Sequence, residues 1–182
     1  MFTAVLTSTR LGLRPVEDAD LPEVFEGLSH PEVIRHYGIS YDTQEACREQ
    51  MAFYQSIENT KSGRFWVITS HNNDFMGIVG VYFYKAQHLS AELGYWLLPA
   101  YWRKGIMHEA LSLVLDDVQA SALVHRLEAQ VETDNVASEK LLLRLGFQKE
   151  GVLRDCERKQ ERFISLSVWS RLFETRFALN SF

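Results

Sequence analysis

A short basic loop that contains a glycine is the part of this sequence best suited to bind an anion. The loop is Trp102-Arg103-Lys104-Gly105-Ile106-Met107, and a segment with helical periodicity follows it. The start of a helix has unpaired backbone N–H groups and a partial positive charge, and glycine lets a ligand approach the backbone closely. The pattern indicates a phosphate site, although a solvated surface loop can have the same composition. The spacings GxxxxGK[ST] and GxGxxG, typical of ATP and dinucleotide sites, do not occur.

Carboxylates and small polar residues near this loop form a second group of candidates. Glu92 lies in the apolar segment before the loop, and Glu128 and Glu132 lie in a later segment that alternates apolar and polar residues. Each carboxylate is a candidate general base or a member of a salt bridge. Asn135 and Ser138 stand three residues apart at the start of a predicted helix, where both types are preferred as caps.

The histidines and cysteines give no sign of a metal site. The two cysteines, Cys47 and Cys156, have neither metal-type spacing nor the pattern of a disulfide framework. We therefore expect reduced, structural thiols, as in a cytoplasmic protein. No metal-type pair occurs among the six histidines, which are His30, His36, His71, His88, His108 and His125.

The segments on either side of the basic loop must position it. Residues 91–98 are apolar and aromatic and end at Pro99, which predicts a strand. The segment that follows Gly105, as far as Ser121, has a helical pattern of apolar residues: Ala110, Leu111, Val114, Leu115 and Val118. This helix forms a crossover between strand 91–98 and a predicted strand at 126–132, so these two strands should be parallel.

The other predicted elements complete a mixed α/β fold. We expect a strand at 9–15, a helix after Asp18 or Asp20, a helix from Thr43 toward Ile57, and a helix from Ser138 to Leu145 that ends at Gly146. Strands at 65–69, 75–84 and 91–98 form an antiparallel meander, and strands at 148–154 and 163–169 are joined by a charged hairpin over 155–162. The sheet is therefore expected to be twisted and mostly antiparallel with a parallel middle pair. The tail after Leu172 is polar, and its pattern predicts no helix or strand.

Composition favours one soluble domain. The chain has 182 residues, of which 46% are hydrophobic and 24% charged, and we expect a single domain over 1–182 with its core at about 7–172. The net charge of −5 gives the whole molecule no bias toward nucleic acid. No apolar run approaches the roughly 20 residues of a membrane span, and the N-terminus has no signal-peptide pattern. A cytoplasmic monomer or homodimer is expected.

Three ordered blocks of the sequence resemble one enzyme family. The basic loop, extended to Ala110, is similar to the acetyl-CoA pyrophosphate loop of the GNAT N-acetyltransferases, in particular the RimJ/RimL type, with its pattern W-G-x-G-[YI]-[AM]-x-E-A. The second block runs from Arg126 through Asp134-Asn135 and Ser138 to Leu145-Gly146-Phe147, and the third opens the chain at 9–15 and continues to His30-Pro31. The resemblance covers about 7–172 and implies a GNAT fold whose two parallel strands splay apart to admit acetyl-CoA.

The resemblance also implies roles for individual residues. Backbone N–H groups of the loop would hold the pyrophosphate, and the strand before it would face the pantetheine arm, with the N–H of Leu98 as candidate oxyanion donor. Asn135 would contact a pantetheine amide and Ser138 would protonate the sulfur, because the tyrosine that many members use is replaced here by Leu142. The implied cofactor contacts are Trp96, Leu97, Leu98, Arg103, Lys104, Gly105, Ile106, Met107, Asn135 and Ser138.

The base and the acceptor site are less defined. Glu92 is the first candidate base, Glu132 the second and Glu128 the third. His36, Tyr41 and Phe83 are candidates for the wall of the acceptor cleft, or else core residues. The function implied is acetyl-CoA-dependent N-acetylation of a primary amine, with a protein N-terminal α-amine as one acceptor. Two alternatives stay open: a small-molecule acceptor such as a polyamine, an amino acid or an aminoglycoside, and a non-catalytic acyl-CoA-binding sensor. No metal is implied.

Overall fold

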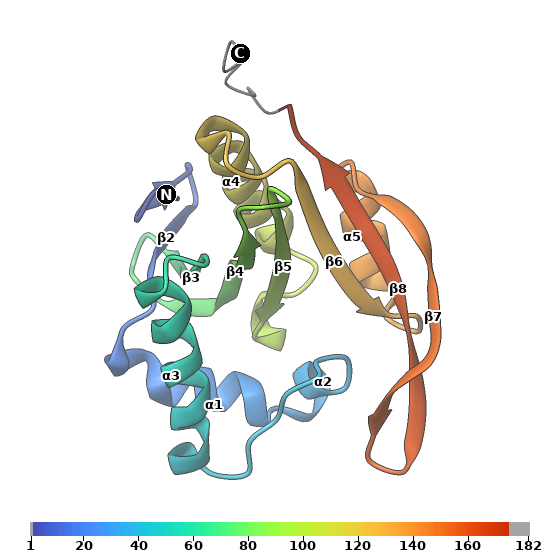
Figure 1. Ribbon diagram of the computed structural model, residues 1–182. Helices are drawn as coiled ribbons and strands as arrows, with labels where there is room; N and C mark the ends of the chain where they lie inside the picture. Colours follow the sequence, from blue (N-terminus) through green and yellow to red (C-terminus); the bar gives the residue numbers. More distant parts are fainter. Residues whose placement is uncertain (1, 175–182) are drawn as a thin grey trace, which may run out of the picture.

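An eight-stranded sheet forms the centre of the molecule in the computed structural model, which describes residues 2–174 (Figure 1). The strand order is β1-β2-β3-β4-β5-β6-β8-β7, and β5/β6 is the parallel pair among otherwise antiparallel neighbours in the described part of the chain. The mixed α/β fold with a parallel middle pair is therefore confirmed. The strands are β1 (Leu6–Thr7), β2 (Leu11–Pro15), β3 (Arg64–Ser70), β4 (Phe75–Lys85), β5 (Ser90–Leu97), β6 (Arg126–Glu132), β7 (Gln148–Lys159) and β8 (Arg162–Leu172).

Helices of different segments cover the two faces of this sheet. Along β5, Leu93 and Leu97 pack in one apolar cluster and Trp96 in the other, as expected for side chains that alternate between faces. The first cluster includes residues of α4 and α5, and the second includes residues of α1, α2 and α3. The helices are α1 (Leu21–Ser29), α2 (Pro31–Ile34), α3 (Gln44–Asn59), α4 (Ile106–Ser121) and α5 (Val136–Arg144), with short 3₁₀ turns η1 (Asp18–Asp20) and η2 (Pro99–Tyr101).

The parallel pairing of β5 with β6 is short. It joins Ser90–Glu92 to Arg126–Glu128, whereas β5 continues to Leu97 and β6 to Glu132. Beyond Glu92 the two strands diverge, and Figure 1 shows them separating toward the end of the sheet where α2 lies. Each strand keeps its antiparallel partner on the other side, β4 for β5 and β8 for β6. The sheet therefore opens between its two middle strands.

The C-terminal hairpin is longer than the sequence pattern predicts. β7 and β8 extend to Lys159 and Arg162, so the predicted charged loop at 155–162 shrinks to a two-residue turn in which Gln160 adopts φ 56°. Bulges at Lys149/Gly151 and Leu153/Glu157 interrupt the ladder. Strand pairing can continue through a charged segment because β7 is an edge strand with exposed side chains, and alternation of apolar and polar residues does not reveal such a strand.

The expected start of a helix at Thr43 is confirmed. Thr43 caps α3 by accepting a hydrogen bond from the N–H of Ala46 at 3.1 Å. Both cysteines are free thiols, Cys47 buried and Cys156 exposed. None of the described helices is long and apolar enough to cross a membrane. Most of the polar tail after Leu172 lies outside the described residues.

Candidate active site

The basic loop turns sharply before α4. Arg103 and Gly105 have φ values of 59° and 75°, both in the left-handed region that favours glycine. This conformation explains why the resembling pattern has glycine where this chain has Arg103. No described side chain caps α4, so the N–H groups of its first turn have no side-chain acceptor. A Cβ built on Gly105 would have Arg10 Nη2 as its nearest neighbour, at 3.8 Å, so this surface is open to a ligand.

Residues from the start of the chain fix this loop in place. Arg10 forms an ion pair with Glu109 of α4, and its Nη1 donates to the carbonyl of Lys104 at 3.4 Å. The Ser8 hydroxyl donates to Glu109 Oε1 at 2.6 Å. The pKa of Glu109 is lowered, first by the hydrogen bond from Ser8 and then by Arg10. Sequence reasoning missed these supports, since the partners are about 100 positions apart and no short motif joins them.

The backbone of β5 presents alternate residues to the opening. The N–H of Leu98 donates to the carbonyl of Met76 at 2.9 Å, so it is directed toward β4. The prediction that Leu98 supplies the oxyanion donor therefore needs correction, because that N–H is already bonded. The carbonyl of Leu97 accepts from the indole N–H of Trp102 at 2.9 Å, away from β4. Alternation along the strand then directs the N–H groups of Leu97 and Tyr95 toward the opening.

Trp96 does not line this opening. Its register partner is Ile78 of β4, and its side chain is buried in the cluster beneath α1 and α3. A Cβ on Gly27 of α1 would lie 2.1 Å from the Trp96 ring, which shows how tightly the ring is packed there. The predicted cofactor contact from Trp96 is not supported by this position, and the residue is a core residue.

A hydrogen bond between two hydroxyls joins β5 to α5 across the opening. Tyr95 Oη and Ser138 Oγ are 2.7 Å apart. Burial raises the pKa of Tyr95 to about 12, although its hydrogen bond to Ser138 acts in the opposite direction. Asn135 caps α5, because its side-chain oxygen accepts the N–H of Ser138 at 3.2 Å. Ser138 thus lies across the opening from β5, and its contact with the sulfur stays a prediction. Tyr95 was missed because its apolar neighbours suggested a core strand.

The three predicted bases have different surroundings. Glu92 lies where the pairing of β5 and β6 ends, and its pKa is raised by burial and by Glu128, while Lys85 acts in the opposite direction. Glu128 accepts a hydrogen bond from Arg126 Nε at 2.6 Å and is therefore part of a salt bridge. Glu132 is buried, with a side chain only 4% exposed, and accepts from Lys159 Nζ at 2.6 Å. Glu92 is thus the one of the three that the described structure leaves without a salt bridge.

The predicted acceptor residues are held by different neighbours. His36 Nδ1 lies 3.3 Å from Asp134 Oδ1. The Tyr41 hydroxyl donates to Gln50 of α3 at 3.2 Å. Phe83 is exposed, and its ring centroid lies 4.9 Å from that of Tyr82. Among the described residues no hydrogen bond or ring contact joins these three side chains.

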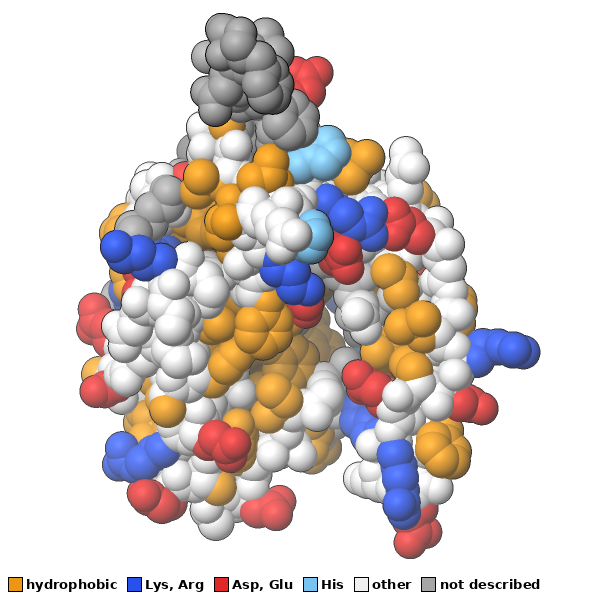
Figure 2. All heavy atoms as spheres, viewed as in Figure 1, with side chains coloured by type: hydrophobic (Ala, Val, Ile, Leu, Met, Phe, Trp, Pro, Cys, Tyr) orange, Lys and Arg blue, Asp and Glu red, His pale blue; other side chains and the backbone are white. Residues whose placement is uncertain are grey.

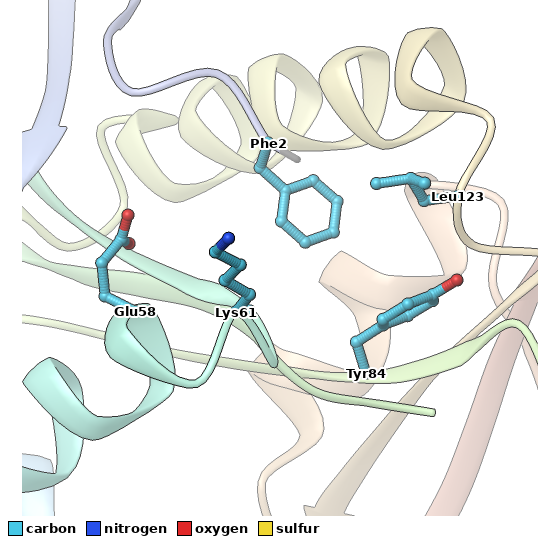
Figure 3. Close-up of a pocket in the computed structure, with 6 residues that line it drawn as sticks. Phe2, Glu58, Lys61, Tyr84 and Leu123 are labelled. Carbon is cyan, nitrogen blue, oxygen red and sulfur yellow. The ribbon is translucent and has the colours of Figure 1, made fainter. Parts of the chain in front are cut away.

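The space-filling view shows where the molecule is hollowed. A deep hollow separates the half that carries α1, α2 and β5 from the half that carries β6, β7 and β8 (Figure 2). It coincides with the divergence of β5 and β6 beyond Glu92. A different pocket, at the other end of β4, contains none of the predicted site residues (Figure 3). It is lined by Phe2, Glu58, Lys61, Gly63, Tyr84 and Leu123.

Comparison with known proteins agrees with this geometry. The family described as "Acetyltransferase (GNAT) domain" matches residues 10–148. The uncharacterized N-acetyltransferase YoaA of Bacillus subtilis (strain 168) is 35% identical over 152 residues, which cover 82% of this chain and 86% of YoaA. The solved structure of RimL, a ribosomal L7/L12 α-N-protein acetyltransferase in complex with coenzyme A, superposes with a TM-score of 0.84 at 19% identity, covering 93% of this chain and 98% of RimL.

A spermidine N-acetyltransferase of Vibrio cholerae, in complex with CoA and spermine, has a similar fold. Its TM-score is 0.81 at 20% identity, and the match covers 91% of this chain and 96% of that one. At these identities the two solved structures establish the arrangement of helices and strands, and the acceptor has to be argued from the site itself.

Proposed function

Since the chain belongs to the GNAT acetyltransferase family and is an N-acetyltransferase, we propose that it transfers the acetyl group of acetyl-CoA to a primary amine, with a protein N-terminal α-amine as the first candidate acceptor. The observation that carries the proposal is the opening between β5 and β6. It begins where the pairing of Glu92 with Glu128 ends, is crossed by the Tyr95–Ser138 hydrogen bond, and lies beside the loop that precedes the uncapped start of α4.

The start of α4 is the proposed pyrophosphate site. The backbone N–H groups of Arg103, Lys104, Gly105, Ile106 and Met107 surround the turn, and the open space at Gly105 allows close approach of a diphosphate. The lysine of the loop adds positive charge beside it. Asn135 and the exposed backbone edge of β5 are the proposed contacts for the pantetheine arm, whose amides can pair with strand groups that β6 leaves free.

The N–H groups of Tyr95 and Leu97 replace Leu98 as proposed oxyanion donors. Both are directed toward the opening, and Tyr95 is the nearer of the two to Glu92 along the strand. Attack of the amine nitrogen on the thioester carbon moves electrons onto the carbonyl oxygen. A fixed donor at that oxygen is worth about 2.7–4 kcal/mol in comparable acyl transfers.

Glu92 is the proposed proton acceptor. Its raised pKa keeps it a stronger base than an ordinary glutamate while it remains ionised above that pKa. As the N–C bond forms, the amine loses a proton to Glu92, directly or through water. The free energy needed to remove the proton is modest for an α-amine, whose pKa is about 8, and larger for a lysine amine, whose pKa is near 10.4.

Ser138 is the proposed proton donor to the leaving sulfur. Burial raises the pKa of Tyr95, so its hydroxyl keeps its proton. Either hydroxyl can be the donor in the 2.7 Å bond between Tyr95 Oη and Ser138 Oγ, and the arrangement that serves the transfer is the one in which Tyr95 donates. The hydrogen of Ser138 is then free to point at the thiolate that leaves when the C–S bond breaks. A thiol has a pKa near 8.5, so this assistance need not be large.

A small polyamine is the second candidate acceptor. The observation that favours it is the carboxylate of Glu92, which no salt bridge of the described residues neutralises, where the opening begins. Glu128 beside it is paired with Arg126, so Glu92 is the carboxylate that would attract an ammonium group of such a substrate.

Acetylation of defined acceptors tests the proposal. The chain is incubated with acetyl-CoA and peptides with free or blocked N-termini, or with spermidine, and acetylated products and free CoA are quantified by mass spectrometry. A thiol reagent is avoided because Cys156 is exposed. Faster turnover of free-N-terminus peptides supports the first acceptor, and faster turnover of spermidine supports the second. Saturable acetyl-CoA binding without any turnover would indicate a sensor, and no saturable binding would refute the proposal.

A further inference from the structure

Three side chains from separate elements converge near the open end of β6. His36 follows α2, Glu132 ends β6, and Asp134 lies in the connection to α5. One ligand atom from each, a histidine nitrogen and two carboxylate oxygens, lies within 4.8 Å of the others. Glu132 and Asp134 are two positions apart, but His36 comes from a distant part of the sequence, so no local motif could have indicated the complete cluster.

Two of the potential metal-ligand atoms in this cluster are buried without a hydrogen-bond partner. His36 Nδ1 and Glu132 Oε2 have no hydrogen-bond partner among the described residues, and the Glu132 side chain is only 4% exposed. A buried, unpaired carboxylate oxygen costs free energy. This oxygen is 3.6 Å from His36 Nδ1, a separation at which one ion can be bonded to both atoms.

The separations suit a tetrahedral metal ion. Ligand atoms about 2.1 Å from zinc lie about 3.4 Å apart at the corners of a tetrahedron, and about 3.0 Å apart in an octahedron. His36 Nδ1 is 3.3 Å from Asp134 Oδ1 and 3.6 Å from Glu132 Oε2. Both distances agree better with the tetrahedral value. The imidazole nitrogen also favours Zn²⁺ over Mg²⁺ or Ca²⁺, which prefer oxygen alone.

Lys159 orients the buried ligand without blocking it. Its ammonium donates to Glu132 Oε1 at 2.6 Å and to the carbonyl of Arg35 at 2.7 Å. This leaves Oε2 directed at His36, much as outer hydrogen bonds orient ligating carboxylates in metalloproteins. With neutral histidine, the two carboxylates and one ammonium leave a net charge of −1, which still attracts a divalent cation.

We propose that His36, Glu132 and Asp134 form a site for a divalent transition-metal ion of the Zn²⁺ type, with a fourth position left for water or another ligand. The ion would join the segment after α2 to the end of β6 and so connect the two sides of the hollow. None of these ligands is among the proposed contacts of the cofactor, but His36 and Glu132 are also candidates for the acceptor wall and the base, so metal binding is measured separately from acetyl transfer.

Titration of the whole chain with Zn²⁺ tests the site. The experiment uses a Cys156→Ser background, since an exposed thiol also binds zinc. Isothermal titration should show one site per chain, and Asp134→Asn and His36→Ala should each weaken the affinity at least tenfold. Co²⁺ in place of Zn²⁺ should give the intense visible absorption of tetrahedral coordination. His88→Ala, which removes an exposed histidine elsewhere, is the control and should bind as the background does.

Thermal unfolding with and without Zn²⁺ shows whether a variant that binds zinc weakly has lost a metal ligand or has failed to fold. Asp134 is 52% exposed, so its replacement should leave the melting temperature without metal unchanged. Zn²⁺ should raise the melting temperature of the background and not that of Asp134→Asn. Absence of saturable binding, equal affinity in the ligand variants and the control, or weak octahedral Co²⁺ absorption would each overturn the proposal.

Discussion

Replacing Gly105 by alanine should change the stability of the fold and the affinity for acetyl-CoA by different amounts. A non-glycine residue at φ 75° costs about 1–2 kcal/mol of folding free energy. The new methyl group meets no protein atom closer than Arg10 Nη2 at 3.8 Å, so no steric term is added. For a chain of this length 1 kcal/mol corresponds to about 2–4 °C in melting temperature. The expected fall is therefore a few degrees.

The effect on cofactor binding should be larger than the effect on folding. If a diphosphate lies against the start of α4, the methyl group displaces it and weakens at least one hydrogen bond to a charged group. Such a bond contributes about 1.5–3 kcal/mol, which corresponds to about 10- to 150-fold in affinity. Isothermal titration with acetyl-CoA measures this change, and circular dichroism measures the melting temperature of the same samples.

Gly146 provides a matched control for this variant. It follows the C-cap residue of α5 with φ 80°, and a Cβ there would also lie in open space, 3.9 Å from Arg171 Nε. Gly146→Ala should therefore lose similar stability and bind acetyl-CoA like the unmodified chain. Equal affinity for acetyl-CoA in Gly105→Ala and Gly146→Ala would refute the assignment of the loop as the pyrophosphate site.

Three further variants test the chemistry and the packing. Glu92→Gln should lower kcat by about 100-fold or more with unchanged acetyl-CoA affinity. Because burial raises the pKa of Glu92 and a base acts when ionised, kcat/KM of the unmodified chain should rise with pH through a value above the usual glutamate range. If the same rise persists in the variant, Glu92 is not the base. Tyr95→Phe removes the hydroxyl bonded to Ser138 and should lower the free energy of unfolding by about 1 kcal/mol, measured by chemical denaturation. Its kcat should fall less than that of Ser138→Ala. A larger fall in Tyr95→Phe would make Tyr95, and not Ser138, the proton donor to the sulfur. Gly27→Ala should destabilise by about 1–3 kcal/mol in thermal melts because its Cβ meets an indole ring at 2.1 Å, whereas Gly38→Ala, with no atom within 4 Å, should not; equal melting temperatures would contradict the packing argument.

The fold was predictable where local pattern and topology agree. The apolar run that ends at Pro99, the glycine and the helical periodicity after it predicted β5, the loop and α4, and α4 ends at Ser121 as expected. The crossover rule then required β5 and β6 to be parallel, as observed. The β7–β8 hairpin was underestimated, because an exposed edge strand lacks the apolar alternation that marks a half-buried one.

The site was predictable only where a motif carries it. Backbone direction decides whether the N–H of Leu98 is free, and this depends on the register with Met76, which no sequence pattern reports. Tyr95 looked like one aromatic residue among several, and its partner Ser138 is 43 positions away. The cluster around Glu132 depends on tertiary contacts between separate elements. Long-range contacts of this kind require the folded chain.

The brief parallel pairing of β5 and β6 limits the main-chain contact between the two halves of one sheet. With the ladder between these strands confined to Ser90–Glu92, the half built on β6, β7 and β8 has few main-chain bonds to the rest. A ligand with its own amide groups that lies along the free edge of β5 would connect the two halves of the sheet. Amide hydrogens at the far ends of β5 and β6 should then exchange slowly with deuterium in the liganded enzyme and quickly without it.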